Sequence, residues 1–87
     1  MKPKIGETIY YLCEDQIIAY TVAFLGDESF IVDEYKDIIT CEFEYSDFNV
    51  VWFKNLKKAF AALRRKYGRK INIVHDVPFM WEVEEKD

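Results

Sequence analysis

The chain has 87 residues, of which 51% are hydrophobic, 17% aromatic and 32% charged, and its formal net charge is −4. This length allows one domain, residues 1–87, with a folded surface of roughly 5,400 Å², and the apolar content excludes a disordered chain. No apolar run approaches the roughly 18 residues of a membrane-spanning helix. The first residues carry no secretory signal pattern, so we expect a cytoplasmic protein that makes no membrane contact.

The first half of the chain predicts short antiparallel strands. They are expected at residues 7–14, 16–25, 29–35, 38–45 and 49–53. The second of these is apolar on both faces, which predicts a central strand covered on both sides. The fourth alternates, with Cys41 and Phe43 inward and Glu42 and Glu44 outward.

The aromatic residues of these strands predict much of the core. Phenylalanine is usually buried, so we expect the core to contain Phe24, Phe30, Phe43, Phe53 and Phe60. Because neighbouring strand residues face opposite sides, either Tyr10 or Tyr11 should face outward.

One amphipathic helix is predicted over residues 55–67. Its apolar stripe consists of Leu56, Ala59, Phe60, Leu63 and Tyr67. Asn55 is the expected N-cap and Gly68 the expected stop. A strand at 70–77 should follow, and 79–83 is either a final edge strand or an ordered tail. The predicted fold is α+β: a small, partly closed antiparallel barrel of about five strands, one helix, then one or two C-terminal strands.

Two sequence segments carry a resemblance to a known class of protein. They read Gly6-Glu7-Thr8-Ile9-Tyr10-Tyr11 and, before the helix, Val51-Trp52-Phe53. In this the chain resembles small uncharacterised SH3-like barrel proteins of bacteria, phages and mobile elements. The resemblance implies a barrel of four to five strands and no catalytic residue.

Charge is distributed very unevenly along the chain. From Glu7 to Asp47 there are eleven acidic residues and one lysine, a net charge of −10. From Lys54 to Lys70 there are eight basic residues and no acidic one, a net charge of +8. One interpretation is that these charges balance within the fold or across a homodimer; two others assign them a function.

The first functional interpretation places an acidic strand face against a basic surface of another protein. Its best candidates are Asp33, Glu42, Glu44 and Asp47, and the candidate aromatic anchors are Tyr45, Trp52 and Trp81. Trp81 is either an anchor or a residue that closes the open end of the barrel. The partner class is a host nucleic-acid-binding protein or nuclease, since by general type the chain resembles small acidic phage inhibitors such as the anti-CRISPR proteins.

The alternative interpretation is a small nucleic-acid-binding regulator that uses the helix. The basic patch would consist of Lys57, Lys58, Arg64, Arg65, Arg69 and Lys70. The −10 segment would repel a long duplex unless it faced away, and no known nucleic-acid-binding motif is present.

Enzymatic activity is not expected. The single histidine, His75, has no nucleophile pattern around it, and His75 and Asp76 are adjacent strand residues, which makes a poor metal chelate. The two cysteines, Cys13 and Cys41, lie in strand-like segments without a CxxC spacing and are expected to be structural. We therefore expect no cofactor, no metal ion and a binding role.

Overall fold

The computed structural model describes residues 2–33, 40–68 and 71–85. These residues form β1 Thr8–Cys13, β2 Gln16–Leu25, β3 Ser29–Asp33, β4 Thr40–Glu44, the 3₁₀ turn η1 Tyr45–Asp47, β5 Trp52–Phe53, α1 Leu56–Tyr67, β6 Ile71–Val77 and β7 Met80–Glu85. The fold is α+β, with a curled antiparallel half-barrel of five strands, one helix and then two C-terminal strands, which confirms the predicted class. The segment predicted as an edge strand or a tail is the strand β7.

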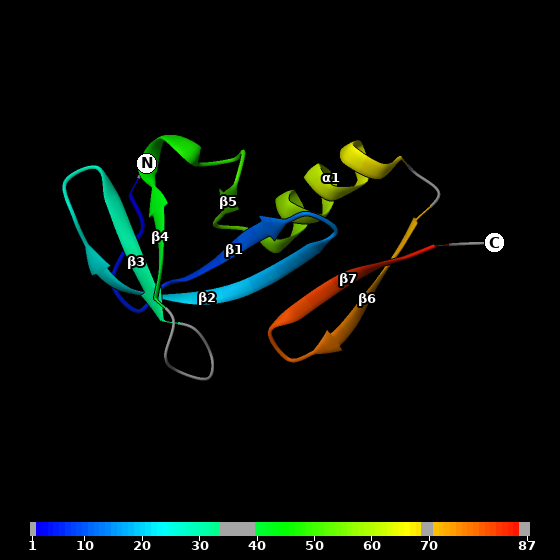
Figure 1. Cartoon of the computed structure of the whole chain (residues 1–87), viewed down its shortest axis with the longest axis horizontal. Helices are drawn as coiled ribbons and strands as arrows, with labels where there is room; N and C mark the ends of the chain where they lie inside the picture. The colour runs from blue at the N-terminus through cyan, green and yellow to red at the C-terminus, as the bar shows by residue number, and fades with distance from the viewer. Residues whose placement is uncertain (1, 34–39, 69–70, 86–87) are drawn as a thin grey trace.

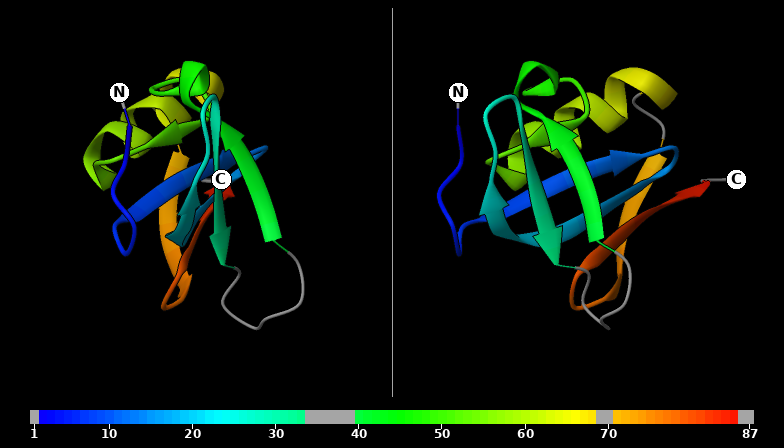
Figure 2. Two further views of the ribbon diagram at one scale, coloured as in Figure 1. Left: turned by 90° about the vertical axis from the view of Figure 1, so that its left-hand side faces the viewer. Right: turned by 60° about the vertical axis from the view of Figure 1, so that its left-hand side comes forward.

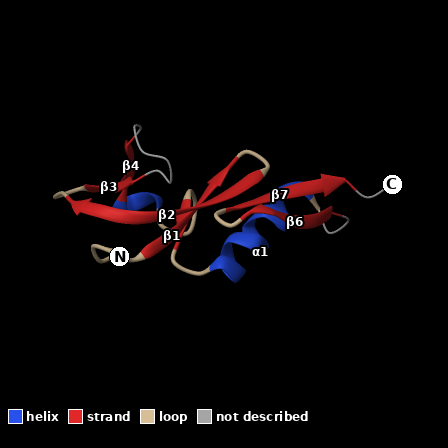
Figure 3. Ribbon diagram, turned by 90° about the horizontal axis from the view of Figure 1, so that it is seen from below, coloured by secondary structure: helices blue, strands red, loops and turns tan. Residues whose placement is uncertain are grey.

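The long strand β2 is the centre of the sheet (Figure 1). One of its edges pairs with β1 over residues 16–21. The other edge is shared, because residues 16–18 pair with β7 and residues 21–25 pair with β3. The sheet therefore branches at β2, so that β3 and β4 lie at one end of the molecule and the β6–β7 hairpin lies with α1 at the other (Figure 3).

Two hydrophobic cores lie on opposite faces of the β1–β2 pair. The buried residues of the first core are Ile9, Tyr20, Val22, Phe30, Val32, Phe43 and Trp52. Those of the second core are Ile17, Phe53, Ala59 and Leu63. Strand alternation sends side chains of β2 to both cores, which confirms that this strand is central and covered on both sides.

The two cores also correct the prediction for the adjacent tyrosines of β1. Tyr11 packs against the first core and Tyr10 against the second. Both side chains are half-buried, so neither of them faces solvent as the prediction required. The reason is that α1 and the C-terminal hairpin cover the face of β1 that an isolated barrel would leave open.

The expectation that Phe24 is a core residue is wrong. The β2–β3 register shifts between Val22 and Phe24, which is the mark of a β-bulge. The bulge reverses the alternation, so Leu25 packs against the first core while Phe24 is 59% exposed. Phe24 pairs with Ile31 on the outer face of the sheet.

The strands of the half-barrel curl around the first core (Figure 2), and a tryptophan side chain links the edge strands β4 and β5, which do not pair with each other. The indole Nε1–H of Trp52 in β5 donates a hydrogen bond of 2.8 Å to the carbonyl of Glu44, at the end of β4. The predicted strand at 49–53 is shorter than expected, since only Trp52–Phe53 pairs with β1. Asn49 has a φ of +65° and opens a tight turn instead.

The helix begins and ends as predicted. The side chain of Asn55 accepts hydrogen bonds from the amides of Lys57 (2.8 Å) and Lys58 (3.3 Å). At the other end Gly68 has a φ of +90° and its amide donates to the carbonyl of Arg64. The twelve residues between them bury Ala59 and Leu63 in the second core. No helix in the described ranges is long and apolar enough to cross a membrane.

The two-core arrangement gives an elongated particle. Its principal extents are 44 × 26 × 16 Å. The accessible surface is 6061 Å², about 12% above the roughly 5,400 Å² expected for a chain of this mass. This larger accessible surface agrees with the elongated shape, because an elongated molecule exposes more surface than a spherical one of the same volume.

Candidate functional site

Part of the acidic segment lies at the opposite end of the molecule from the basic helix, whereas its turn of Glu14 and Asp15 lies beside that helix, where the Lys66 ammonium donates to the Glu14 carbonyl. The strands β3 and β4 lie at one end and α1 at the other (Figures 1 and 3). Among the described residues a single ion pair joins the two segments, between Lys54 Nζ and Glu7 Oε2 at 3.6 Å. Direct pairing within the fold therefore neutralises little of either charge.

A pocket of about 410 Å³ lies at the acidic end. Its lining residues are Glu28, Glu44, Tyr45 and Ser46. Glu28 belongs to the turn between β2 and β3, Glu44 is the last residue of β4, and Tyr45 and Ser46 belong to η1. The two segments meet because Ser29 pairs with Glu44 in the β3–β4 register.

Hydrogen bonds fix the walls of this acidic pocket. The amide of Tyr45 donates to the Glu28 carbonyl at 3.0 Å, and the Tyr45 hydroxyl donates to the Gly26 carbonyl at 2.8 Å. The ring of Tyr45 stacks on that of buried Phe30, with a centroid separation of 5.7 Å. The Trp52 indole holds the Glu44 backbone from the side of the first core. The tyrosine is thus held in one position before any ligand arrives.

The chain already places one of its own cations in this region. The ammonium of Lys2 lies over the Tyr45 ring, 5.1 Å from its centroid. Cations are attracted to the face of an aromatic ring, and more strongly where water is excluded. Two carboxylates and one ring face are together suited to a lysine or arginine side chain.

The outer face of β3 and β4 continues the acidic surface beyond the pocket. Asp33 and Glu42 are exposed there, and Glu42 accepts a hydrogen bond of 2.7 Å from the Ser29 hydroxyl. Between the acidic side chains runs an apolar row, in which Phe24 of β2 pairs with Ile31 of β3, and Ile31 pairs with Glu42 of β4. The sequence pointed to the acidic residues of this face and missed its apolar row.

Asp47 does not lie on the acidic face with the other three predicted acidic residues. It ends η1 and is half-buried. Its backbone carbonyl accepts hydrogen bonds from the amides of Val50 (3.0 Å) and Val51 (2.9 Å), which builds the turn before β5. The structure thus brings Asp33, Glu42 and Glu44 onto one face and gives the Asp47 backbone a structural role.

The three predicted aromatic anchors lie in three different parts of the structure. Tyr45 is half-buried at the acidic pocket. Trp52 is fully buried in the first core, so the prediction that it is a surface anchor is wrong. Its size and its hydrogen bond to Glu44 make it the link between β5 and β4.

Trp81 belongs to the opposite end of the molecule. It packs against the second core and contacts Tyr10 and Phe60 edge-to-face, with centroid separations of 6.0 and 6.2 Å. The exposed His75 ring stacks on it at 4.8 Å. Trp81 therefore covers the second core rather than the open end of the half-barrel.

The described basic residues of the predicted patch are exposed on α1. They are Lys57, Lys58, Arg64 and Arg65. Arg69 and Lys70, predicted to extend the patch, lie outside the described residues. The guanidinium of Arg64 lies over the Phe60 ring, 5.9 Å from its centroid.

The described residues bring together no group of three or more His, Cys, Asp or Glu side chains able to hold a metal ion. Cys13 and Cys41 are half-buried free thiols. The pKa of Tyr11 is raised above 10.0, first by its hydrogen bond to Cys13 and then by burial. This tyrosine is thus a neutral, packed side chain near neutral pH.

No family model matches the chain, and comparisons with curated protein sequences and with solved structures find no match either.

Proposed function

We propose that this protein is a non-enzymatic binding module that docks its acidic end against a basic surface of another protein. The observation that carries the proposal is the acidic pocket of Glu28, Glu44 and Tyr45, whose ring already lies under the Lys2 ammonium at 5.1 Å. A lysine or arginine side chain of the partner would take the position of Lys2. Lys2 is an exposed side chain of the N-terminal segment, so its displacement disrupts no packed element.

The pocket and the face beside it have the composition of a protein interface. Interfaces have a desolvated aromatic or apolar centre and a polar rim. Phe24 and Ile31 supply the apolar centre, and Asp33, Glu42 and Glu44 supply the charged rim. Close charge pairs across a protein interface have measured coupling energies of about 1.5–7 kcal/mol.

The lack of internal compensation supports a partner outside the chain. If the acidic strands existed to balance the basic helix, their side chains would pair with it. In the described part of the molecule, only Lys54 and Glu7 form such a pair, and Glu7 precedes β1 rather than belonging to β3 or β4. The acidic face is thus left for a cationic ligand, and the charge separation should steer the encounter.

The partner that fits this surface is a protein with a cationic groove. Such grooves bind nucleic acid through phosphates, and a rigid acidic ridge competes for the same cations. Occupying the groove of a nuclease would make this protein an inhibitor of the type that phages and mobile elements carry.

The test is a charge reversal with a matched control. The double substitution Glu42→Lys with Glu44→Lys should weaken binding of a fluorescently labelled oligo-arginine peptide by tens-fold in an anisotropy titration. The control Glu14→Lys with Asp15→Lys makes the same change of net charge at exposed residues of the β1–β2 turn and should change the affinity by less than about threefold. Equal losses in both variants would show attraction by net charge alone and would sink the proposal, as would an unchanged affinity in the first variant.

A partner-level test uses the same two variants. Immobilised wild-type protein should retain from host lysate a nucleic-acid-binding protein that the Glu42→Lys, Glu44→Lys variant loses and the control variant keeps. Retention of the same proteins by all three would contradict an acidic docking face.

A further inference from the structure

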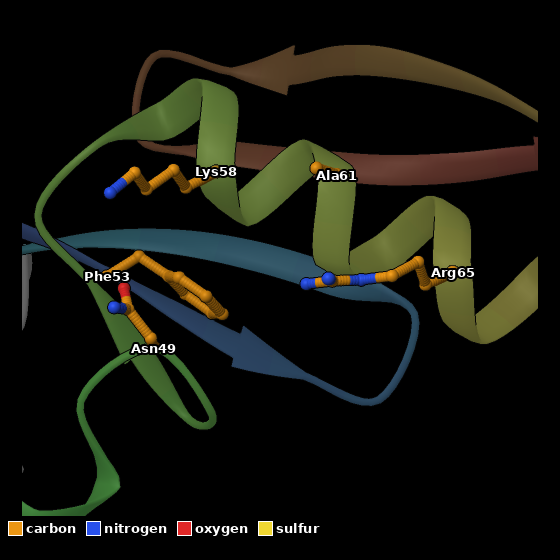
Figure 4. A pocket seen from close by; sticks show the side chains of 5 residues that line it. All are labelled: Asn49, Phe53, Lys58, Ala61 and Arg65. Carbon is orange, nitrogen blue, oxygen red and sulfur yellow. The ribbon is translucent and has the colours of Figure 1, made fainter.

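A second pocket lies at the basic end of the molecule, away from the acidic face. It has a volume of about 380 Å³ and is lined by Asn49, Phe53, Lys58, Ala61 and Arg65. Figure 4 shows Lys58 and Arg65 reaching from α1 on one side of this pocket, with Phe53 and Asn49 on the other. Two cationic side chains and one carboxamide side chain therefore line one hollow.

Local structure positions the two cations. Lys58 and Arg65 are seven residues apart, two turns of α1, so their Cα atoms are separated by about 10.5 Å along the axis on the same face. Ala61 stands between them, and its single methyl group leaves the hollow open. The long side chains then span the gap above Phe53, which is only 1% exposed.

Asn49, on the opposite side of the pocket from α1, is fixed by its backbone conformation and by a hydrogen bond. Asn49 adopts a φ of +65°, a left-handed conformation that asparagine tolerates better than most residues. Its amide donates to the Trp52 carbonyl at 2.8 Å, which ties the turn to β5. The side-chain amide of Asn49 is thus presented to the pocket by an anchored backbone.

The cations of this pocket differ from Lys54 and Lys66 in having no hydrogen-bond or ion-pair partner among the described residues, whereas the other two lysines are engaged. Lys54 pairs with Glu7, and the Lys66 ammonium donates to the Glu14 carbonyl at 3.0 Å. Within the part of the chain that the structure describes, no carboxylate or carbonyl accepts from the side chains of Lys58 or Arg65. Both side chains are exposed and line the same pocket, so their positive charges remain available to an anion bound there.

We propose that this pocket binds a phosphate group of a nucleic-acid backbone. Guanidinium and ammonium groups are the usual protein ligands of phosphate, the first as a planar fork and the second as a point charge. The buried Phe53 ring has no free face on which a base could stack, so the pocket would bind backbone without regard to sequence.

The surroundings of the pocket favour a polymer over a free phosphate ion. Lys57 and Arg64 are exposed on the same outward side of α1 and extend the positive surface beyond the pocket. The acidic strands β3 and β4 lie at the far end of the molecule, so they would not repel a strand passing over the helix (Figure 1). Four such contacts predict a salt slope, d log K/d log[salt], of about −2.8 for a single strand and about −3.6 for a duplex.

The inference is independent of the proposed protein-binding function, because the two surfaces share no residue. The experiment is an anisotropy titration of labelled single-stranded and duplex oligonucleotides at about 50 and about 150 mM salt. The substitution Lys58→Gln with Arg65→Gln should lower the affinity at least tenfold and reduce the magnitude of the slope by about 1.4 to 1.8. The matched control Lys54→Gln with Lys66→Gln removes the same charge from engaged lysines and should change the affinity by less than about threefold.

A third variant tests the carboxamide without straining the turn. Asn49→Gly keeps the left-handed backbone conformation and should weaken oligonucleotide binding by severalfold. No binding at low salt, or equal losses in the Lys58/Arg65 variant and its control, would overturn the proposal. The anion could instead be free phosphate. In that case millimolar inorganic phosphate would compete fully with the oligonucleotide, and Lys57→Gln with Arg64→Gln would leave the oligonucleotide affinity unchanged. These two results together would overturn the nucleic-acid assignment.

Discussion

The β-bulge in β2 makes a quantitative prediction about two phenylalanines that the sequence treats alike. Phe30 is fully buried in the first core, and Phe24 is 59% exposed. Truncation of a buried phenylalanine to alanine costs about 3–5 kcal/mol, including the cavity that remains. Full burial of a phenylalanine side chain contributes about 1.5–3 kcal/mol, so the 41% of Phe24 that is covered contributes about 0.6–1.2 kcal/mol.

Phe30→Ala should therefore destabilise the protein by about 2–4 kcal/mol more than Phe24→Ala. For a domain of this size each kcal/mol lowers Tm by about 4–8 °C, so Phe30→Ala should lower Tm by at least about 12 °C. Urea unfolding is a suitable assay, because Trp52 lies in the first core and Trp81 packs against the second, and their fluorescence reports both.

A third variant tests the reversal of alternation itself. Leu25 takes the inward position that strict alternation assigns to Phe24, so Leu25→Ala should cost more than Phe24→Ala although the leucine side chain is smaller. Equal costs for Phe24→Ala and Phe30→Ala, or a smaller cost for Leu25→Ala than for Phe24→Ala, would refute the bulge and the register derived from it.

Two further predictions concern single side chains. Because the Tyr11 pKa is raised, chiefly by its hydrogen bond to Cys13, the stability that this tyrosine contributes is complete below pH 10 and is lost as the pH rises through the raised value. Tyr11→Phe should thus flatten the alkaline fall of the urea midpoint, and unchanged pH profiles would contradict this. Asn55→Ala removes the acceptor for two amides at the start of α1 and should cost about 1 kcal/mol, measured by the same unfolding assay; Asn55→Asp is the control that retains the cap.

Much of the fold was predictable because its signals are local. The alternation around Phe43 gave β4, and the stripe from Leu56 to Tyr67 between Asn55 and Gly68 gave α1. The sequence could not predict the bulge after Val22, because one extra residue in a strand leaves no trace in an alternation that is apolar on both faces. The fate of Trp52 also depended on a distant residue, the Glu44 carbonyl to which its indole donates.

The candidate sites show the same division. Glu44 and Tyr45 stood out in the sequence, but Glu28 did not, because it joins them through the β3–β4 register. At the basic end, Lys58 and Arg65 follow from helical spacing, whereas Asn49 reaches the pocket from the turn before β5. In each pocket the lining residue that the sequence did not indicate, Glu28 or Asn49, comes from a turn that contains none of the residues that the sequence did indicate.

The sequence by itself determined the amphipathic helix, the antiparallel strands and the separation of −10 and +8 into two segments, since each depends only on the order of neighbouring residues. Tertiary structure alone decided that Tyr11 packs against the first core and Tyr10 against the second, and that Phe24 is exposed. It also decided which charged side chains line the same pocket. These outcomes depend on strand register and on where the C-terminal hairpin pairs with β2. Both are set by the burial of side chains far apart in the chain, and no local pattern contains that information.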